Sequence, residues 1–116
     1  MSTRRLRIAV PTKGEMGLED TVSDVFGRAN TFTIIDIEDG KVKAVEVLRN
    51  PTISYKYGAG PIVVNKLIEH GVSMVVSGEL GPGASGLLEQ HNVQVVTVKP
   101  GLPVAKAIEL VKHKND

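Results

Sequence analysis

The dipeptide Asp39-Gly40 constrains the fold of this chain more than any other feature. It separates two segments rich in β-branched residues, Thr31 to Glu38 and Lys41 to Leu48. Asp-Gly readily supplies the positive φ angles of a two-residue hairpin turn. The two segments are therefore predicted to be strands that lie antiparallel and next to each other in a sheet.

Hydrophobic periodicity predicts the remaining elements. Along 31–38, apolar side chains fall on both faces, Phe32 and Ile34 on one and Ile35 and Ile37 on the other, so this strand is expected inside the sheet. The order β-β-β-α-β-α-β-α predicts an α/β fold of ribonuclease H-like architecture: a five-stranded mixed sheet of order 3-2-1-4-5 with three helices, strands one to three antiparallel and the later ones added by right-handed crossovers. We expect strands at 6–10, 31–38, 41–48, 72–77 and 93–98. We expect one helix with Pro61 in its first turn, a second at about 83–91, and a third that opens at Pro103.

Composition limits both the size of the fold and its chemistry. The 116 residues are expected to form a single domain, 1–116, and the net charge of +1 gives no basic footprint for nucleic acid. The chain has no cysteine, which excludes a disulfide framework, a thiolate nucleophile and an iron-sulfur cluster held by its own sulfurs. No apolar run approaches the length of a membrane span, and the basic start lacks the apolar segment of a secretion signal. We expect a cytoplasmic protein.

A glycine-rich segment, residues 77–83, connects the strand predicted at 72–77 to the helix predicted at 83–91. Glycine lets the backbone approach a ligand closely, and the free N–H groups of a helix's first turn favour an anion. Ligands of α/β proteins also tend to sit at the carboxyl ends of parallel strands. The segment carries neither the dinucleotide fingerprint nor a phosphate loop with its lysine and hydroxyl. Turns of this kind also occur in proteins that bind nothing there, so both interpretations remain open.

Short motifs follow one another in a fixed order along almost the whole chain. They are Arg7-Ile8-Ala9-Val10-Pro11; Val22-Ser23-Asp24-Val25-Phe26-Gly27-Arg28-Ala29 followed by Phe32; Asn50-Pro51; Gly58-Ala59-Gly60; and His70-Gly71-Val72 through Gly78 to Gly81-Pro82. In this order they resemble the family named for dinitrogenase iron-molybdenum cofactor biosynthesis. The resemblance implies a small domain, accessory to nitrogen fixation, that binds or carries the iron-molybdenum cofactor or a precursor cluster, or has an analogous role in cells without nitrogenase. It does not imply catalysis.

Two departures from the family pattern bear on metal binding. In the family, the phenylalanine before Gly27-Arg28 usually follows a histidine, and this chain has Val25 in that place. Some relatives also carry histidines or cysteines in the loop before Gly58, whereas residues 52–57 here read Thr-Ile-Ser-Tyr-Lys-Tyr. Because valine has no metal-binding atom, position 25 cannot ligate a cluster in this chain.

The candidate ligand site lies at the carboxyl edge of the sheet, where the glycine loops are predicted to meet. Arg28 offers a fork of donors suited to carboxylate or phosphate oxygens, and Lys13 offers a point charge. We expect no catalytic and no metal-ligating residue. The expected ligand-binding residues are Lys13, Ser23, Arg28, Gly58, Gly60, Ser77, Gly78, Glu79, Gly81 and Gly83, with Thr12 and Ser85 nearby.

Histidines are predicted to lie at the opposite edge. His70 and His91 each end a helix that leads into a parallel strand, where a cation is favourable. Ser77 and Ser85 would therefore lack a histidine base, and no hydrolytic triad is expected. Nuclease activity would need a cluster of carboxylates that begins on the first strand, and residues 6–10 contain no acid.

Two hypotheses from different classes remain. The first is a non-enzymatic binding or carrier domain whose partner is an anionic small ligand or metal cluster, such as the iron-molybdenum cofactor or a precursor. The second is a protein-interaction or regulatory module of the same fold that has lost metal binding. A cationic pocket at the glycine edge would favour the first, and a flat, apolar edge would favour the second. Neither nucleic acid nor a membrane is expected as a partner.

Overall fold

The hairpin that Asp39-Gly40 predicts is present and confirms the antiparallel pairing. Asp39 has φ 52° and Gly40 has φ 79°, the left-handed conformation that both central residues of a type I′ turn require. The turn joins strand β2 (Thr31–Glu38) to strand β3 (Lys41–Arg49). One residue of β3 is extra: Asp36 pairs with Ala44 and Ile37 pairs with Val42, so Lys43 forms a β-bulge.

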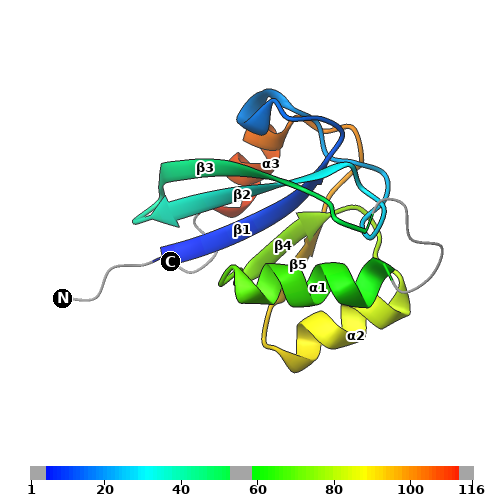
Figure 1. Ribbon diagram of the computed structural model, residues 1–116. Coiled ribbons are helices and arrows are strands. Elements are labelled where there is room, and N and C mark those ends of the chain that lie inside the picture. The colour runs from blue at the N-terminus through cyan, green and yellow to red at the C-terminus, as the bar shows by residue number, and fades with distance from the viewer. Residues whose placement is uncertain (1–4, 53–58, 113–116) are drawn as a thin grey trace.

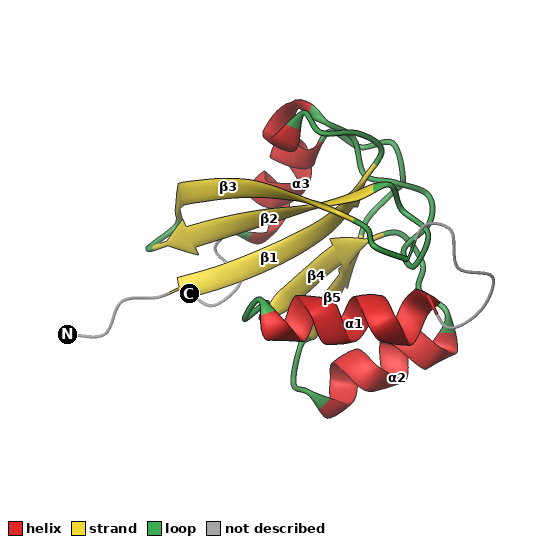
Figure 2. Ribbon diagram, in the orientation of Figure 1, coloured by secondary structure: helices red, strands yellow, loops and turns green. Residues whose placement is uncertain are grey.

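The computed structural model describes residues 5–52 and 59–112. Its five-stranded sheet has the predicted order, β3-β2-β1-β4-β5. β1 pairs antiparallel with β2 and parallel with β4, and β5 pairs parallel with β4. Figure 2 shows this mixed sheet in yellow and the helices in red. Besides β2 and β3, the elements are β1 (Arg5–Thr12), a 3₁₀ helix η1 (Gly17–Glu19), α1 (Ala59–Glu69), β4 (Met74–Ser77), α2 (Pro82–Gln90), β5 (Gln94–Thr97) and α3 (Val104–Val111).

Helices cover both faces of the sheet. α1 and α2 lie side by side against one face, and α3 with η1 lies against the other (Figure 1). The alternation predicted for β2 is confirmed, because Phe32 and Ile34 belong to the core under α1 and α2 while Ile35 and Ile37 belong to the core under α3. Each side of the sheet therefore has its own apolar layer, with β2 between the two.

The first part of the chain departs from expectation in two places. β1 continues to Thr12, beyond Pro11, because Pro11 and Thr12 still pair with β2. The segment after it contains η1, a short helical turn that is not among the elements expected from the sequence. Asp20 holds this turn in place, since its carboxylate accepts the N–H groups of Met16 and Thr21 at 3.1 and 2.8 Å.

The topology gathers loops at one end of the molecule. β1 and β4 run in the same direction, and α1 and α2 both begin at the end of the sheet where these strands finish, the right-hand side of Figure 1. This edge is where ligands of α/β sheets usually bind. In the part of the chain that the structure covers, no helix has the length and apolar character needed to cross a membrane.

Candidate functional site

A groove of about 610 Å³ opens at the carboxyl edge of the sheet. Three segments far apart in the sequence form it: the loop after β1, the first turn of α1, and the connection from β4 into α2. A volume of this size is within the range of small-molecule sites. Its lining residues are Asp24, Val25, Phe26, Gly27, Arg28, Ala59, Gly60, Pro61, Glu79, Gly81, Gly83 and Ala84.

Two glycines hold the loop against the start of α1. A Cβ atom on Gly27 would lie only 3.1 Å from the backbone nitrogen of Gly60 and 3.2 Å from its Cα. On the other side of the loop, Phe26 is buried and packs edge-to-face on Phe32 of β2, with ring centroids 5.4 Å apart. The loop is therefore fixed on both sides, and the groove wall that it forms is defined by packing.

Two other glycines face open space in the groove. A Cβ atom on Gly81 or Gly83 would meet no heavy atom within 4 Å. Neither residue has a positive φ, and Gly81 has φ −67°, which any residue adopts. Gly78 differs, because a Cβ there would come within 2.9 Å of the Pro100 side chain. Packing thus requires glycine at 78 but not at 81 or 83, although glycine suits position 81 as the N-cap of α2.

The charges of the groove are mixed. Arg28 supplies one cation, and Asp24 and Glu79 supply two carboxylates, all on exposed residues. The first-turn N–H groups of α1 and α2 add positive potential, because a helix cannot pair them internally. Within residues 5–52 and 59–112, no three histidine, aspartate or glutamate side chains are grouped so that they could hold a metal ion.

Five of the predicted site residues come together in this groove: Arg28, Gly60, Glu79, Gly81 and Gly83. Gly78 lies just before it, against Pro100. Gly58 lies outside the described residues.

The two predicted serines are buried and bond to nearby backbone. The Ser23 Oγ accepts the N–H of Val25 at 3.2 Å, and the Ser77 hydroxyl donates to the carbonyl of Gly78 at 2.6 Å. Thr12 is likewise buried, with its hydroxyl 2.6 Å from that of Thr31 and 3.0 Å from that of Thr33. These side chains shape the loops, and none of them lines the groove.

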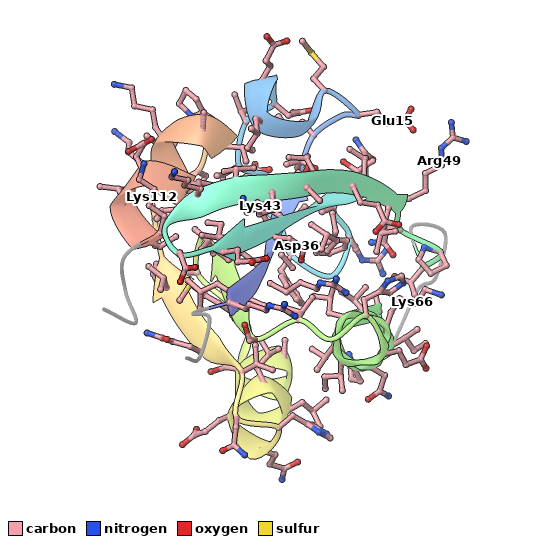
Figure 3. The ribbon with its side chains drawn as sticks, turned by 90° about the vertical axis from the view of Figure 1, so that its left-hand side faces the viewer. Glu15, Asp36, Lys43, Arg49, Lys66 and Lys112 are labelled. Atoms are coloured by element: carbon pink, nitrogen blue, oxygen red, sulfur yellow. The ribbon has the colours of Figure 1, made fainter. Side chains whose placement is uncertain are left out.

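Lys13 lies in a separate depression of about 320 Å³, together with Glu15, Asn30 and Arg49. Arg49 is already paired there, since its Nε lies 3.1 Å from Oε1 of Glu15 (Figure 3). Ser85 lies in another depression beside β5. The structure thus separates Lys13 and Ser85 from the residues of the groove.

The described histidines lie at the opposite edge, as predicted. His91 follows the last turn of α2, and its N–H donates to the carbonyl of Leu87 at 3.2 Å. His70 follows α1, and its carbonyl accepts Nη1 of Arg7 at 2.7 Å. His113 lies outside the described residues. Neither His70 nor His91 lines the groove.

Arg7 also anchors β2 at this edge. Its Nε donates to Oδ1 of Asp36 at 2.6 Å and its Nη2 to Oδ2 at 3.3 Å. The hydrogen bonds that Arg7 donates to Asp36, and then the charge of Asp36, raise the pKa of the Arg7 guanidinium above its ordinary value. Figure 3 looks onto this side of the molecule, where Asp36 and Lys43 line a second hollow of about 450 Å³. Its charged side chains are largely paired with one another.

Sequence reasoning missed two residues that support the groove, Asn50 and Thr52. Both are buried; Asn50 donates to carbonyls of the loop after β1, and Thr52 in turn donates to Asn50. The sequence did contain a signal for them, the pair Asn50-Pro51, but sequence reasoning used this pair only as one of the family motifs. A buried asparagine beside a turn-forming proline is a residue whose amide is expected to have backbone partners.

Comparison with known protein families identifies one match. The sequence model of the family described as "Dinitrogenase iron-molybdenum cofactor" matches residues 4–114. An uncharacterized protein of Methanocaldococcus jannaschii is 25% identical over 95 residues, which cover 82% of this chain and 76% of that protein.

Two solved structures share the fold along nearly the whole chain. The apo form of the orange protein from Desulfovibrio gigas is 27% identical with a TM-score of 0.83, and the match covers 97% of this chain and 92% of that one. A Thermotoga protein described as a candidate NifB protein is 34% identical with a TM-score of 0.73, covering 95% and 89%.

Proposed function

The chain belongs to the dinitrogenase iron-molybdenum cofactor family, and from this premise we propose that it is a non-enzymatic binding or carrier domain. Its ligand is an anionic metal cluster, the iron-molybdenum cofactor or a precursor, held in the groove between the loop 24–28, the start of α1 and the start of α2. The cluster is cargo that the protein receives and releases.

One observation carries the proposal: the backbone at Gly81 and Gly83 is open to the groove, and packing within the protein requires glycine at neither position. Both positions border the groove, where an added Cβ would enter open space. Gly81 is the N-cap of α2, a position that glycine suits, whereas Gly83 lies inside the first turn, where glycine increases the entropy lost on folding. Close approach of a ligand to the backbone of this turn supplies a reason for glycine at 83.

The donor set of the groove suits a cluster that arrives with its own ligands. Its described side chains offer no thiolate and no imidazole, so they supply none of the usual protein ligands of iron-sulfur clusters. Backbone N–H groups at two helix starts and the Arg28 guanidinium can instead donate to anionic oxygen or sulfur atoms on the surface of the cluster. The carboxylates of Asp24 and Glu79 oppose an anion, so binding should be moderate and release easy.

A second candidate function is a protein-interaction module of the same fold. It is favoured by Val25, which is 47% exposed at the groove and replaces the histidine usual in the family with an apolar contact surface. Apolar side chains ringed by charges are typical of the contact surfaces between proteins. The experiment below separates the two functions.

The test is an anaerobic titration with isolated iron-molybdenum cofactor, followed by backbone amide NMR. We compare the wild type with Gly83→Ala and with Gly86→Ala, a matched change in the same helix at a glycine that lies outside the groove and also has open space around it. Alanine favours the helix at both places by up to about 1 kcal/mol. Arg28→Ala is compared with Arg5→Ala in the same way.

The proposal expects shifts confined to 24–28, 59–61 and 79–84 in the wild type. Gly83→Ala and Arg28→Ala should each weaken binding by about tenfold or more, while Gly86→Ala and Arg5→Ala bind like the wild type. No shifts at a large excess of cofactor would exclude the carrier function for this chain and leave the interaction module. If Gly83→Ala and Gly86→Ala weakened binding equally, the ligand would not bind in this groove.

A further inference from the structure

The side chain of Asn50 is buried under the loop that forms one wall of the groove. Only 5% of the residue is exposed. Its Nδ2 donates to the carbonyl of Gly27 at 2.9 Å and to the carbonyl of Ala29 at 2.8 Å. Both hydrogens of the amide are therefore used on one short stretch of backbone, the stretch on which Arg28 lies between the two carbonyls.

Thr52 fixes the orientation of this amide. The Oδ1 of Asn50 accepts the backbone N–H of Thr52 at 2.8 Å and its hydroxyl at 2.7 Å. Thr52 itself is fully buried. Since Oδ1 accepts two hydrogen bonds from Thr52, the NH₂ group points toward the loop, and a flipped amide would set its oxygen against the two loop carbonyls and its NH₂ against the Thr52 N–H.

The backbone of Asn50 adds one more tie, because its N–H donates to the carbonyl of Asn30 at 3.1 Å. The loop 24–29 is thus held by two contacts, one with Asn50 and one between Gly27 and Gly60. The first tie consists of hydrogen bonds and the second of van der Waals contact. Together they determine where the backbone on either side of Arg28 runs.

We propose that Asn50 is a positioning residue: its amide holds the loop 24–29, and with it Arg28, in the geometry that forms the binding groove. The consequence for ligand affinity rests on the function proposed above, whereas the hold on the loop is a property of the protein without ligand. Asn50 does not itself contact the ligand and affects binding only through the position of the loop.

The test uses the isosteric variant Asn50→Asp. It keeps an acceptor for Thr52 but places an oxygen, instead of two N–H groups, against the carbonyls of Gly27 and Ala29. The matched control is Asn30→Asp, because the Asn30 amide also donates to a loop carbonyl, that of Lys13 at 2.9 Å, outside the groove. A second pair is Thr52→Val, which removes the hydroxyl that orients the amide, and Thr52→Ser, which retains it.

Two readouts are measured at a temperature where every variant is folded. The first is amide hydrogen exchange in the ligand-free protein, in particular of Ala29, whose N–H donates to the carbonyl of Phe26 at 3.1 Å. The second is affinity for isolated iron-molybdenum cofactor. Asn50→Asp should speed exchange in 24–29 by about tenfold or more relative to the strands, and weaken binding by a similar factor. Thr52→Val should do the same to a lesser degree, Thr52→Ser should restore wild-type behaviour, and Asn30→Asp should change neither readout.

The possible results separate the two proposals. Faster exchange spread evenly over strands and loop would mean a general loss of stability and would overturn the positioning role. Local loosening of 24–29 with unchanged affinity would overturn the link between this loop and the ligand. If the wild type itself fails to bind cofactor, the proposed function is wrong, and the exchange measurement still decides whether Asn50 positions the loop.

Discussion

Gly27 and Gly60 meet backbone to backbone, with so little room that a Cβ on Gly27 would lie 3.1 Å from the Gly60 nitrogen. The contact joins the loop after β1 to the first turn of α1, two segments separated by the whole β2–β3 hairpin. Because the nearest atoms are backbone atoms, no side chain could change its rotamer to make room for a Cβ. The groove therefore owes part of its shape to the absence of one methyl group.

Gly27→Ala should destabilise the protein, because the new methyl group forces the loop away from α1. We expect a loss of about 1–3 kcal/mol in the free energy of unfolding, as for other overpacked sites. Urea unfolding followed by circular dichroism measures it. Gly86→Ala is the comparison, and there the free energy should rise. An unchanged midpoint for Gly27→Ala would show that the loop can move aside without cost.

Glu79→Gln should strengthen cofactor binding if the ligand is an anion. Because Glu79 is exposed and its charge is well solvated, removing this like charge is worth about 1 kcal/mol, or about fivefold in affinity. Glu89→Gln removes a carboxylate from α2, outside the groove, and should have no effect. Weaker binding by Glu79→Gln would instead identify its carboxylate as a contact of the ligand. Asp24→Asn, tested in parallel, should behave like Glu79→Gln.

Val25→His should give the groove a metal-binding group that the wild type lacks. Val25 is 47% exposed, so the larger side chain fits without disturbing the core. An imidazole ligates metal only when neutral. The variant should therefore bind the cofactor more tightly at about pH 7.5 than at about pH 5.5, while the wild type shows no such step. Titrations at the two pH values check this, and equal affinity in the variant would mean that position 25 does not reach the cluster.

Arg7→Ala should cost about 0.5–1 kcal/mol, since both partners of the Arg7–Asp36 pair are partly exposed and the pair is screened. The pKa of Arg7 is raised in the folded state, first by its hydrogen bonds with Asp36 and then by the charge of Asp36. Such a contribution is complete below the unfolded-state pKa and is lost only as the pH rises through the folded-state pKa. The difference from the wild type should thus stay constant from about pH 7 to about pH 10 in urea unfolding. Arg5→Ala, whose Nε is 3.9 Å from Glu38, should cost less.

Much of the fold could be predicted because its strongest signals are local. Asp39-Gly40 determines the hairpin turn by its own backbone preferences. The apolar residues on both faces of β2 indicate an inner strand, whichever strands lie beside it. The turn η1 could not be predicted this way, because its three residues have no period and depend on Asp20, whose carboxylate accepts the N–H of Met16. The extension of β1 to Thr12 depends on pairing with β2, which the isolated segment does not reveal.

The position of the glycines at this edge could be predicted from the sequence more readily than the hydrogen-bond partners of the polar residues. Strand direction alone brings the first turns of α1 and α2 to one edge, so Gly60, Gly81 and Gly83 could be grouped from the sequence. Whether a hydroxyl such as that of Ser77 faces solvent or its own backbone depends on one torsion angle, which no pattern records. The ligand-binding role of all these residues stays a prediction.

The bulge at Lys43 has a consequence for how copies of this protein behave toward one another. β3 is an outer strand of the sheet, and its free N–H and C=O groups could pair with a strand of another chain. An extra residue breaks the regular spacing of that edge, and Lys41 and Lys43 line it with positive charge. Two such edges brought together would repel each other and mismatch their hydrogen-bonding groups. The irregularity next to the hairpin thus protects a valine-rich strand from aggregation at high concentration.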